Sequence, residues 1–507
     1  MKKLINWLKW IDNNLIHIFL SVFIFFIPLY PKLPFSHVEY TYISIRLEDL
    51  FIAVFYAVTF IQLLRKKFSL KPKFLILFIL FWISVMISYV VGFYFQNTIR
   101  INQVGLLHAL RRIEYMSVFF IAFSLIDSKQ RFFYYLKLFF ASVLLIGLYG
   151  IGQRFLGFPA VQTMNPAFAR GLILYLTPEA RISSTFGGHF DLAAFSVFAI
   201  PLLLGYFLFS NKKIYFGLFT LTLVILLYTA SRISFIAYVV TATLFLLLNK
   251  KWRLWILVAL LSAILLYVTG DLSKRFLQTI QIKQVFVNEQ TGGQTINQKI
   301  NPKELPAGGF EIPGLSAKNK KNTPEEQKKL EQQIMILAEN QALQEAQDQG
   351  KVLTQVELQK RTQQIASLIN PKNKILCDIS CATRLQVEWP RAVAAFTYNP
   401  FFGAGPSSIT EATDNDYLRW LGEFGLVGTL LFLTIIFAIT KYVFKSIKKF
   451  STGEKYILGG FIFGLLALLM NAVYIDVFEA SKVAYMFWLI AGFFVGFAHL
   501  NYENKRK

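Results

Sequence analysis

The chain has 507 residues, of which 55% are hydrophobic and 52 are phenylalanine, and its formal net charge at pH 7 is +23. A soluble domain would have to leave much of this apolar surface in contact with water, so the composition excludes a soluble fold. A bilayer core about 30 Å thick is crossed by a helix of roughly 20 mostly apolar residues. We therefore expect an all-α polytopic membrane protein.

Apolar runs of this length, bounded by charged residues, predict about 12 transmembrane helices. The first run follows two lysines, as in a signal peptide. Pro28, Pro31 and Pro34 stand where a small-residue cleavage site would be expected, so we interpret this run as an uncleaved span. The predicted spans are residues 15–31, 48–64, 74–95, 107–126, 133–152, 191–210, 214–230, 233–248, 254–270, 424–440, 456–473 and 483–499.

Lysines and arginines gather in alternate connections between these spans, and short basic connections stay on the cytoplasmic side during insertion. We therefore expect a protein of the cytoplasmic (inner) membrane with both termini in the cytoplasm. The predicted order is a membrane domain of about nine spans at 1–270, an extracytoplasmic loop at 271–423, and a membrane domain at 424–507 with three spans and a cytoplasmic tail. Cations facing anionic lipid headgroups account for most of the charge, so nucleic-acid binding is not needed to explain it.

Charged side chains at membrane depth are the candidates for function, because each costs roughly 2.5–3.5 kcal/mol near the bilayer centre on insertion scales. In chain order, the first are Arg111, Arg112 and Glu114 at the outer end of the fourth span. They either extend a phosphate-binding surface or form an ion pair within the membrane.

Two more arginines lie at the predicted outer face. The segment RISSTFGGHFDLAAF before the sixth span carries Arg181, His189 and Asp191, and the turn YTASRISF between the seventh and eighth spans carries Arg232. A lone arginine there could also simply extend its charge to the lipid interface.

The outer loop contains a charge-rich section, residues 318–370, without aromatic residues. Thr323 with Glu326, and Thr354 with Glu357, have the spacing of helix N-terminal capping boxes, so a helical hairpin is predicted at 323–370. It is either a partner-binding arm or a solvated insertion without chemistry. Residues 287–316, rich in glycine and proline, are expected to be flexible linker.

The chain has two cysteines, Cys377 and Cys381, and both lie in the predicted outer loop. An oxidising compartment would allow a local disulfide between them, and two unpaired residues are the alternative. Metal binding is less favoured, because no histidine or further cysteine is near.

The re-entry into the tenth span combines a turn with polar residues. Asn399, Gly403 and Gly405 indicate a loop whose backbone approaches another segment closely and could position an acceptor. Polar residues then follow just outside the membrane: Asp414, Asn415, Asp416 and Tyr417.

On this topology, three segments distant in sequence meet on one face. Arginine suits phosphate oxygens, so a lipid-linked phosphate is the expected ligand. A carboxylate beside it could act as general base toward a hydroxyl. The alternative is a set of structural salt bridges between these arginines and aspartates.

Four motifs in this order resemble the O-antigen ligase and O-antigen polymerase family over most of the membrane domain. They are R-x-S-S-T-F-G at Arg181, T-x-S-R at Arg232, N-P-x-x-G-x-G at residues 399–405, and D-N-x-Y-L-x-x-L-x-E-x-G-x-x-G at residues 414–428. The resemblance implies a membrane glycosyltransferase with a GT-C-like architecture. Such an enzyme moves a glycan from undecaprenyl pyrophosphate to an acceptor hydroxyl or amide on a glycan, lipid or protein, with inversion and without a metal ion or other cofactor.

The resemblance also implies roles for residues. Arg181 and Arg232 would hold the pyrophosphate, and Arg111 and Arg112 could extend that surface. The family's presumed catalytic histidine is replaced by Asp414.

This replacement implies a changed acceptor, a base supplied by His189, or an inactive relative. We expect Asp414 to be the base, with His189 and Asp416 as reserves. A polysaccharide or lipid transporter is the alternative function, although the two halves of the chain show no clear internal repeat.

Overall fold

The computed structural model divides the chain into two compact units, residues 1–273 with 388–507, and residues 274–387. The described residues are 2–37, 44–163, 171–177, 180–270, 272–273, 275–276, 280–288, 310–316, 324–348, 350–351, 353–377, 379–409 and 412–503.

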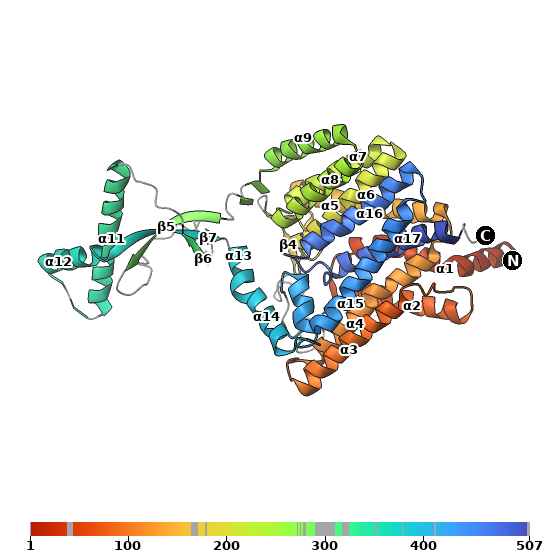
Figure 1. The fold of residues 1–507 in the computed structure, drawn as a ribbon, viewed down its shortest axis with the longest axis horizontal. Coiled ribbons are helices and arrows are strands. Elements are labelled where there is room, and N and C mark those ends of the chain that lie inside the picture. Colours follow the sequence, from red (N-terminus) through yellow and green to blue (C-terminus); the bar gives the residue numbers. More distant parts are fainter. Residues whose placement is uncertain are drawn as a thin grey trace. The chain divides into compact units, whose positions relative to one another are not determined.

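The first unit is a bundle of long apolar helices, and a helix covers each of the twelve predicted spans (Figure 1). Among the described residues, nine helices are long and apolar enough to cross a membrane, which supports a multi-pass membrane protein. The other three are the charged helix α4 and the shorter helices α7 and α8. The twelve are α1 (Lys2–Leu29), α2 (Leu47–Leu64), α3 (Leu75–Val90), α4 (Asn102–Leu125), α5 (Lys129–Phe155), α6 (His189–Ser210), α7 (Lys213–Tyr228), α8 (Arg232–Leu248), α9 (Trp252–Thr269), α15 (Asp416–Ile447), α16 (Thr452–Asn471) and α17 (Ser481–Glu503).

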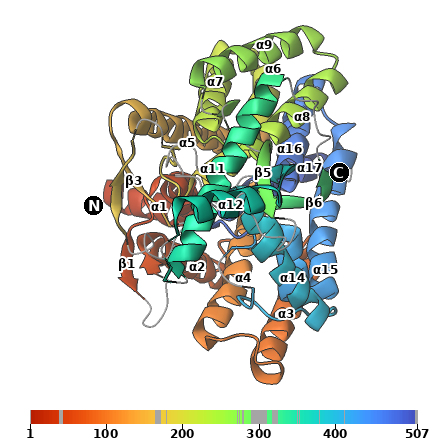
Figure 2. The same cartoon turned by 90° about the vertical axis from the view of Figure 1, so that its left-hand side faces the viewer.

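Helices α6 and α17 are the most buried of the bundle, α16 packs on α6, and α9 and α3 lie at opposite edges (Figures 1 and 2). Glycines let α6 and α16 approach closely: a Cβ at Gly460 would lie 2.6 Å from the Pro201 carbonyl oxygen, and one at Gly464 would lie 2.8 Å from that of Phe198. Small residues at such contacts are typical of helix packing within membranes, where van der Waals contact replaces the hydrophobic drive.

The connections between helices alternate between the two ends of the bundle. One, the basic end, has connections 65–74, 126–128, 211–212, 249–251 and 448–451. The other, the site end, has connections 30–46, 96–101, 156–188, 229–231 and 472–480 together with the start of α15. The predicted cytoplasmic lysine and arginine clusters fall at the basic end, and which side of a membrane it faces stays a prediction.

Helix α15 is broken in its first part. Gly425 has φ 63° and ψ −165°, outside the helical region. The preceding loop replaces the lost helical hydrogen bonds: Ala404 and Gly405 donate to the carbonyls of Gly422 and Glu423 at 2.8 and 3.0 Å, and Leu426 donates to Pro400 at 2.8 Å. The predicted close approach of this loop to another segment is therefore present, and that segment is the break in α15.

Because of this pairing, residues 388–423 belong with the membrane helices, and the second unit ends at Val387 instead of near residue 423. The segment includes α14 (Trp389–Tyr398), which packs on α15. A short π-helical segment, η2 (Arg384–Glu388), precedes α14, and another, η1 (Val91–Phe95), ends α3. Short hairpins at the site end pair β1 (Pro34–His37) with β2 (Ser44–Arg46), and β3 (Pro159–Val161) with β4 (Ile173–Tyr175).

The second unit contains the predicted helical pair, α11 (Pro324–Asp348) and α12 (Gln355–Ala366), whose apolar faces share a core that includes Leu337 and Ile365. The capping box at Thr354 and Glu357 is present. Thr323, the first residue of the other predicted box, lies outside the described residues.

The expected linker contains regular structure that the glycine and proline content concealed. Strands β5 (Ile280–Asn288) and β6 (Phe310–Ser316) pair antiparallel on either side of β7 (Ile369–Cys377), with α13 (Ile379–Thr383) following. Linker is therefore the wrong description for residues 310–316, and residues 289–309 lie outside the described part. Cys381 is disulfide-bonded, which decides for the disulfide alternative.

Candidate functional site

Hydrogen bonds join the three predicted site segments at the site end of the bundle. The Ile182 amide, next to Arg181, donates to the Tyr228 carbonyl at 3.3 Å, in the turn that leads to Arg232. Ser234 on α8 donates to the Asn471 side chain at 2.7 Å. The Asp416 amide donates to the carbonyl of Ala472, the next residue along, at 2.9 Å. These contacts link the three segments at one end of the bundle, and the site expected there stays a prediction.

Arg181 and His189 are direct partners. A guanidinium Nη1 of Arg181 contacts His189 Nε2, and the Phe190 ring lies 5.9 Å from the Arg181 carbon Cζ. Because arginine can only donate, the contact requires His189 to accept at Nε2 and to carry its proton on Nδ1. His189 therefore orients Arg181, and its Nε2 is engaged by that contact.

Arg232 is the first residue of α8 and is half-buried. The preceding residue, Ser231, is buried and shares a 2.8 Å hydroxyl contact with Ser234. This serine pair anchors the helix start to Asn471 on α16, so the position of Arg232 is set by buried hydrogen bonds.

The segment from Asp414 to Tyr417 starts α15. Asp414 is half-buried with a left-handed backbone, φ 49°. Asn415 is the helix cap and accepts from the Leu418 amide at 3.0 Å. Asp416 is fully buried, and its Oδ2 accepts from the amides of Val477 and Phe478 at 2.8 and 3.1 Å.

Tyr417 donates to the Leu469 carbonyl at 2.9 Å. Asp416 and Tyr417 thus tie the start of α15 to α16 and to the connection after it. Asp416 Oδ1 has no hydrogen-bond partner among the described residues.

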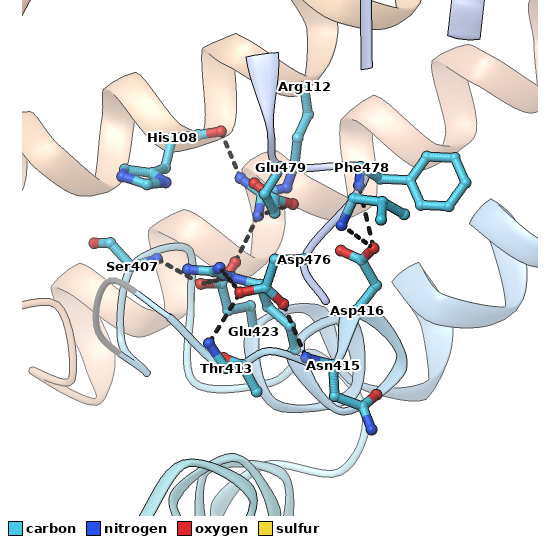
Figure 3. Close-up of polar contacts among 12 residues, drawn as sticks. His108, Arg112, Ser407, Thr413, Asn415, Asp416, Glu423, Asp476, Phe478 and Glu479 are labelled. Carbon is cyan, nitrogen blue, oxygen red and sulfur yellow. Dashed lines mark hydrogen bonds and ion pairs between the residues drawn. The ribbon is translucent and has the colours of Figure 1, made fainter. Parts of the chain in front are cut away.

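Sequence reasoning missed Asp476, which organises this segment from the connection between α16 and α17 (Figure 3). Its carboxylate accepts from the amides of Thr413 and Asn415 at 2.9 and 3.1 Å, and forms a 2.7 Å ion pair with Arg419. Asp476 therefore holds the backbone on both sides of Asp414. Its signal in the sequence is a pair of carboxylates, Asp476 and Glu479, between two apolar runs.

Arg112 lies in a buried ion-pair network with Glu423 and Glu479, each 2.7 Å away (Figure 3). Glu423 also accepts from the Ser407 amide at 3.2 Å and lies 3.4 Å from Arg419 Nε. Burial raises the pKa of Glu479, and the two arginines oppose that rise. Of the two interpretations of Arg112, the structure favours the ion pair, which is buried and formed with these partners and not with Glu114.

Arg111 points elsewhere, as neighbouring positions on a helix do. Its guanidinium lies 3.7 Å from Asp49 of α2. Glu114 contacts the Tyr485 hydroxyl on α17. The predicted cluster of Arg111, Arg112 and Glu114 is therefore divided among three different sets of partners.

The loop that contains Asn399, Gly403 and Gly405 packs against the ion-pair network at the break in α15. Asn399 Oδ1 accepts from the Phe402 amide at 3.2 Å. Gly403 has φ 72°, and a Cβ there would lie 2.5 Å from the Glu423 carbonyl oxygen. The contacts shown for these residues hold the break in α15, and their acceptor-positioning role stays a prediction.

Within the described ranges, no group of three or more His, Cys, Asp or Glu side chains is placed to hold a metal ion. No protein-family model matches the chain, and no curated protein matches it. The resemblance to the O-antigen ligase and polymerase family therefore rests on the four motifs.

Proposed function

We propose that the protein is a membrane glycosyltransferase that moves a glycan from a lipid-linked pyrophosphate to an acceptor hydroxyl or amide. The observation that carries the proposal is the set of hydrogen bonds that joins the Arg181 segment, the Arg232 turn and the Asp414 segment. These bonds bring two arginine-bearing segments and a carboxylate-bearing one to the same end of the bundle, as a phosphate-leaving reaction requires.

In the proposed reaction, the acceptor oxygen attacks the anomeric carbon while the bond from that carbon to the pyrophosphate oxygen breaks. The acceptor proton passes to the Asp414 carboxylate, and the lipid pyrophosphate leaves with the bonding electrons. Arg181 and Arg232 stabilise its developing charge, and such preorganised contacts are worth several kcal/mol in a site shielded from water. Attack from the opposite face inverts the anomeric centre.

Asp414 suits the base role better than the two reserves. The Nε2 atom of His189 is engaged by Arg181, and Oδ2 of Asp416 accepts from two backbone amides. Asp414 is half-buried, and the amides that flank it are fixed by Asp476. Aspartate is nevertheless a weaker base than histidine.

The test is the lipid-linked glycan content of cells that carry Arg232→Gln, Asp414→Asn or no copy of the gene. We expect both variants to accumulate the donor to the same extent as the deletion, with normal amounts of membrane-inserted protein. Arg131→Gln, at the basic end, is the matched control and should accumulate none. Full glycan transfer by both site variants would overturn the proposal.

A transporter remains the second candidate, because α15 is broken beside the buried Arg112–Glu423 ion pair, and interrupted helices beside charges are typical of transporters. Reconstituted vesicles distinguish the two functions. Movement of a labelled lipid-linked glycan between leaflets without release of lipid pyrophosphate would favour the transporter and count against the transferase.

A further inference from the structure

A second group of cations lies at the site end, apart from Arg181 and Arg232. This cationic cluster comprises three buried residues, Lys32, Arg46 and Lys482, and the partly exposed Arg111, which come from four different segments. Lys32 follows α1, Arg46 precedes α2, Arg111 is on α4 and Lys482 is in the first turn of α17. Burying cations together is costly unless each is paired, so the partners of each decide what the cluster does.

Lys32 is 6% exposed, and among the described residues it has neither a hydrogen bond nor an ion pair. The nearby charges that act on its ammonium are those of Asp191, Arg46, Glu48 and Arg111. Burial is the largest influence on the Lys32 ammonium and lowers its pKa. The side chain is therefore a buried cation without a direct partner among the described residues.

Among the described residues, the carboxylate partners of Arg46 and Arg111 are distant ones. Arg46 lies 3.8 Å from Glu48, and Arg111 lies 3.7 Å from Asp49. Arg46 Nε and Glu48 Oε2 are buried without a hydrogen-bond partner among the described residues. Both separations are too long for hydrogen bonds.

Two other buried arginines of this protein have close ion-pair partners. Arg112 and Arg419 each approach a carboxylate to 2.7 Å. The distance from the guanidinium to the nearest carboxylate oxygen is thus about one ångström longer for Arg46 and Arg111 than for Arg112 and Arg419.

Lys482 is different, because its ammonium donates to the carbonyls of Pro28, Tyr30 and Thr185, with 3.2 Å to Pro28 and 2.6 Å to Thr185. It fastens the Arg181 segment to the end of α1 and adds its positive charge to the cluster. The ligand donors are thus Lys32, Arg46 and Arg111.

The four cations face four carboxylates, Glu48, Asp49, Glu114 and Asp191, so the formal charges balance. The pairing is nevertheless incomplete, because Lys32 and the Nε atom of Arg46 have no hydrogen-bond partner among the described residues. Two guanidinium groups and one ammonium suit an anion with several oxygens, because their donors point in different directions.

We infer that Lys32, Arg46 and Arg111 form an oxyanion site that binds a phosphate group. The inference goes beyond the proposed glycan transfer and does not depend on it. The phosphate is that of a lipid headgroup or a free anion, and the two sources are separable by experiment.

The test uses the full chain purified in a neutral maltoside detergent, with binding measured by calorimetry. The probes are dioctanoyl phosphatidic acid, inorganic phosphate and, as the phosphate-free control, dioctanoylglycerol. We expect Lys32→Met and Arg46→Gln each to weaken binding of the phosphate probe about tenfold or more, as loss of a charge-assisted hydrogen bond does. Arg131→Gln should bind as the wild type does.

Binding of phosphatidic acid alone identifies a lipid phosphate, and equal binding of inorganic phosphate identifies a free anion. Either result supports the site if the Lys32 and Arg46 variants reduce it. Absence of binding by both probes, or binding reduced by Arg181→Gln but not by these variants, would overturn the inference.

Thermal unfolding supplies a readout that separates a ligand role from a structural one. Removing an unsatisfied buried charge should raise the unfolding midpoint of the ligand-free protein, so Lys32→Met should be more stable while it binds less. A lower midpoint without ligand, together with unchanged binding in Lys32→Arg and Lys32→Met, would show that the lysine serves only the fold.

Discussion

Replacing Arg112 by methionine should destabilise the protein strongly. The Arg112 side chain is 6% exposed and forms 2.7 Å ion pairs with both Glu423 and Glu479. Methionine keeps most of the aliphatic volume and removes the charge. Glu423 would keep only the Ser407 amide at 3.2 Å and Arg419 at 3.4 Å. Breaking a buried ion pair on one side costs about 3–5 kcal/mol, because the remaining charge is left uncompensated.

An exposed pair of the same length provides the matched control. Arg131 and Asp127 are 2.6 Å apart, but their side chains are 42% and 53% exposed. Such a pair contributes about 0–1 kcal/mol, so Arg131→Met should be nearly neutral. The two variants differ in burial and not in ion-pair distance.

The assay is equilibrium unfolding in mixed micelles of maltoside and dodecyl sulfate, followed by tryptophan fluorescence. The double variant Arg112→Met with Glu423→Gln should recover about 1–2 kcal/mol of the loss, because one of the uncompensated carboxylates is gone. A loss under 1 kcal/mol for Arg112→Met, equal to that of Arg131→Met, would refute the account of the buried network.

Three further outcomes follow from single contacts. Gly403→Ala should lower the free energy of unfolding by about 1–2 kcal/mol because of its left-handed backbone alone, and the clash of the new Cβ with the Glu423 backbone adds to this loss. Gly217 has open space around it, so Gly217→Ala should not destabilise the protein in the same unfolding assay. Asp416→Ala should lower the free energy of unfolding by about 1–3 kcal/mol, because it leaves two backbone amides unpaired. Asp416→Asn should lower it less, because the side-chain carbonyl still accepts a hydrogen bond. Equal losses in the two variants would contradict this role of Asp416. Hydrogen bonds from Thr354 hold the pKa of Glu357 below its usual 4.5, so this cap stabilises α12 above that pH and is lost as the pH falls through the lowered value. Amide exchange at the start of α12 should therefore speed up in acid, and Glu357→Gln should remove that dependence.

The helices could be predicted because long apolar runs bounded by charge leave little choice in a bilayer. The start of α15 was less predictable. The apolar run predicts a start at residue 424, but α15 begins eight residues earlier, at Asp416, after the cap residue Asn415. The break at Gly425 separates this first part from the apolar run.

The ion-pair partners could not be predicted, because they depend on packing between distant segments. Arg112 and Glu423 are separated by 311 positions, and nothing local to either residue specifies the other. Asp476 was passed over for the same reason. Strand β6 was missed because Pro313 and Gly314 are typical of loops, and its pairing with β7 outweighs that local preference.

The cationic cluster could not be predicted from the sequence either. Lys32, Arg46 and Lys482 are each unremarkable beside an apolar run, and only the packing of α1, α2 and α17 brings their charges together. A charge count along the sequence cannot separate such a buried group from lysines at the lipid interface.

The most direct test of the transferase is release of lipid pyrophosphate by the purified protein in proteoliposomes that contain the lipid-linked donor and acceptor lipids from the same cells. The account predicts that release requires the acceptor and falls about 10²–10³-fold in Arg232→Gln, as loss of one charge-stabilising donor does. Release at the wild-type rate by Arg232→Gln, or none by the wild type with donor and acceptor present, would contradict it.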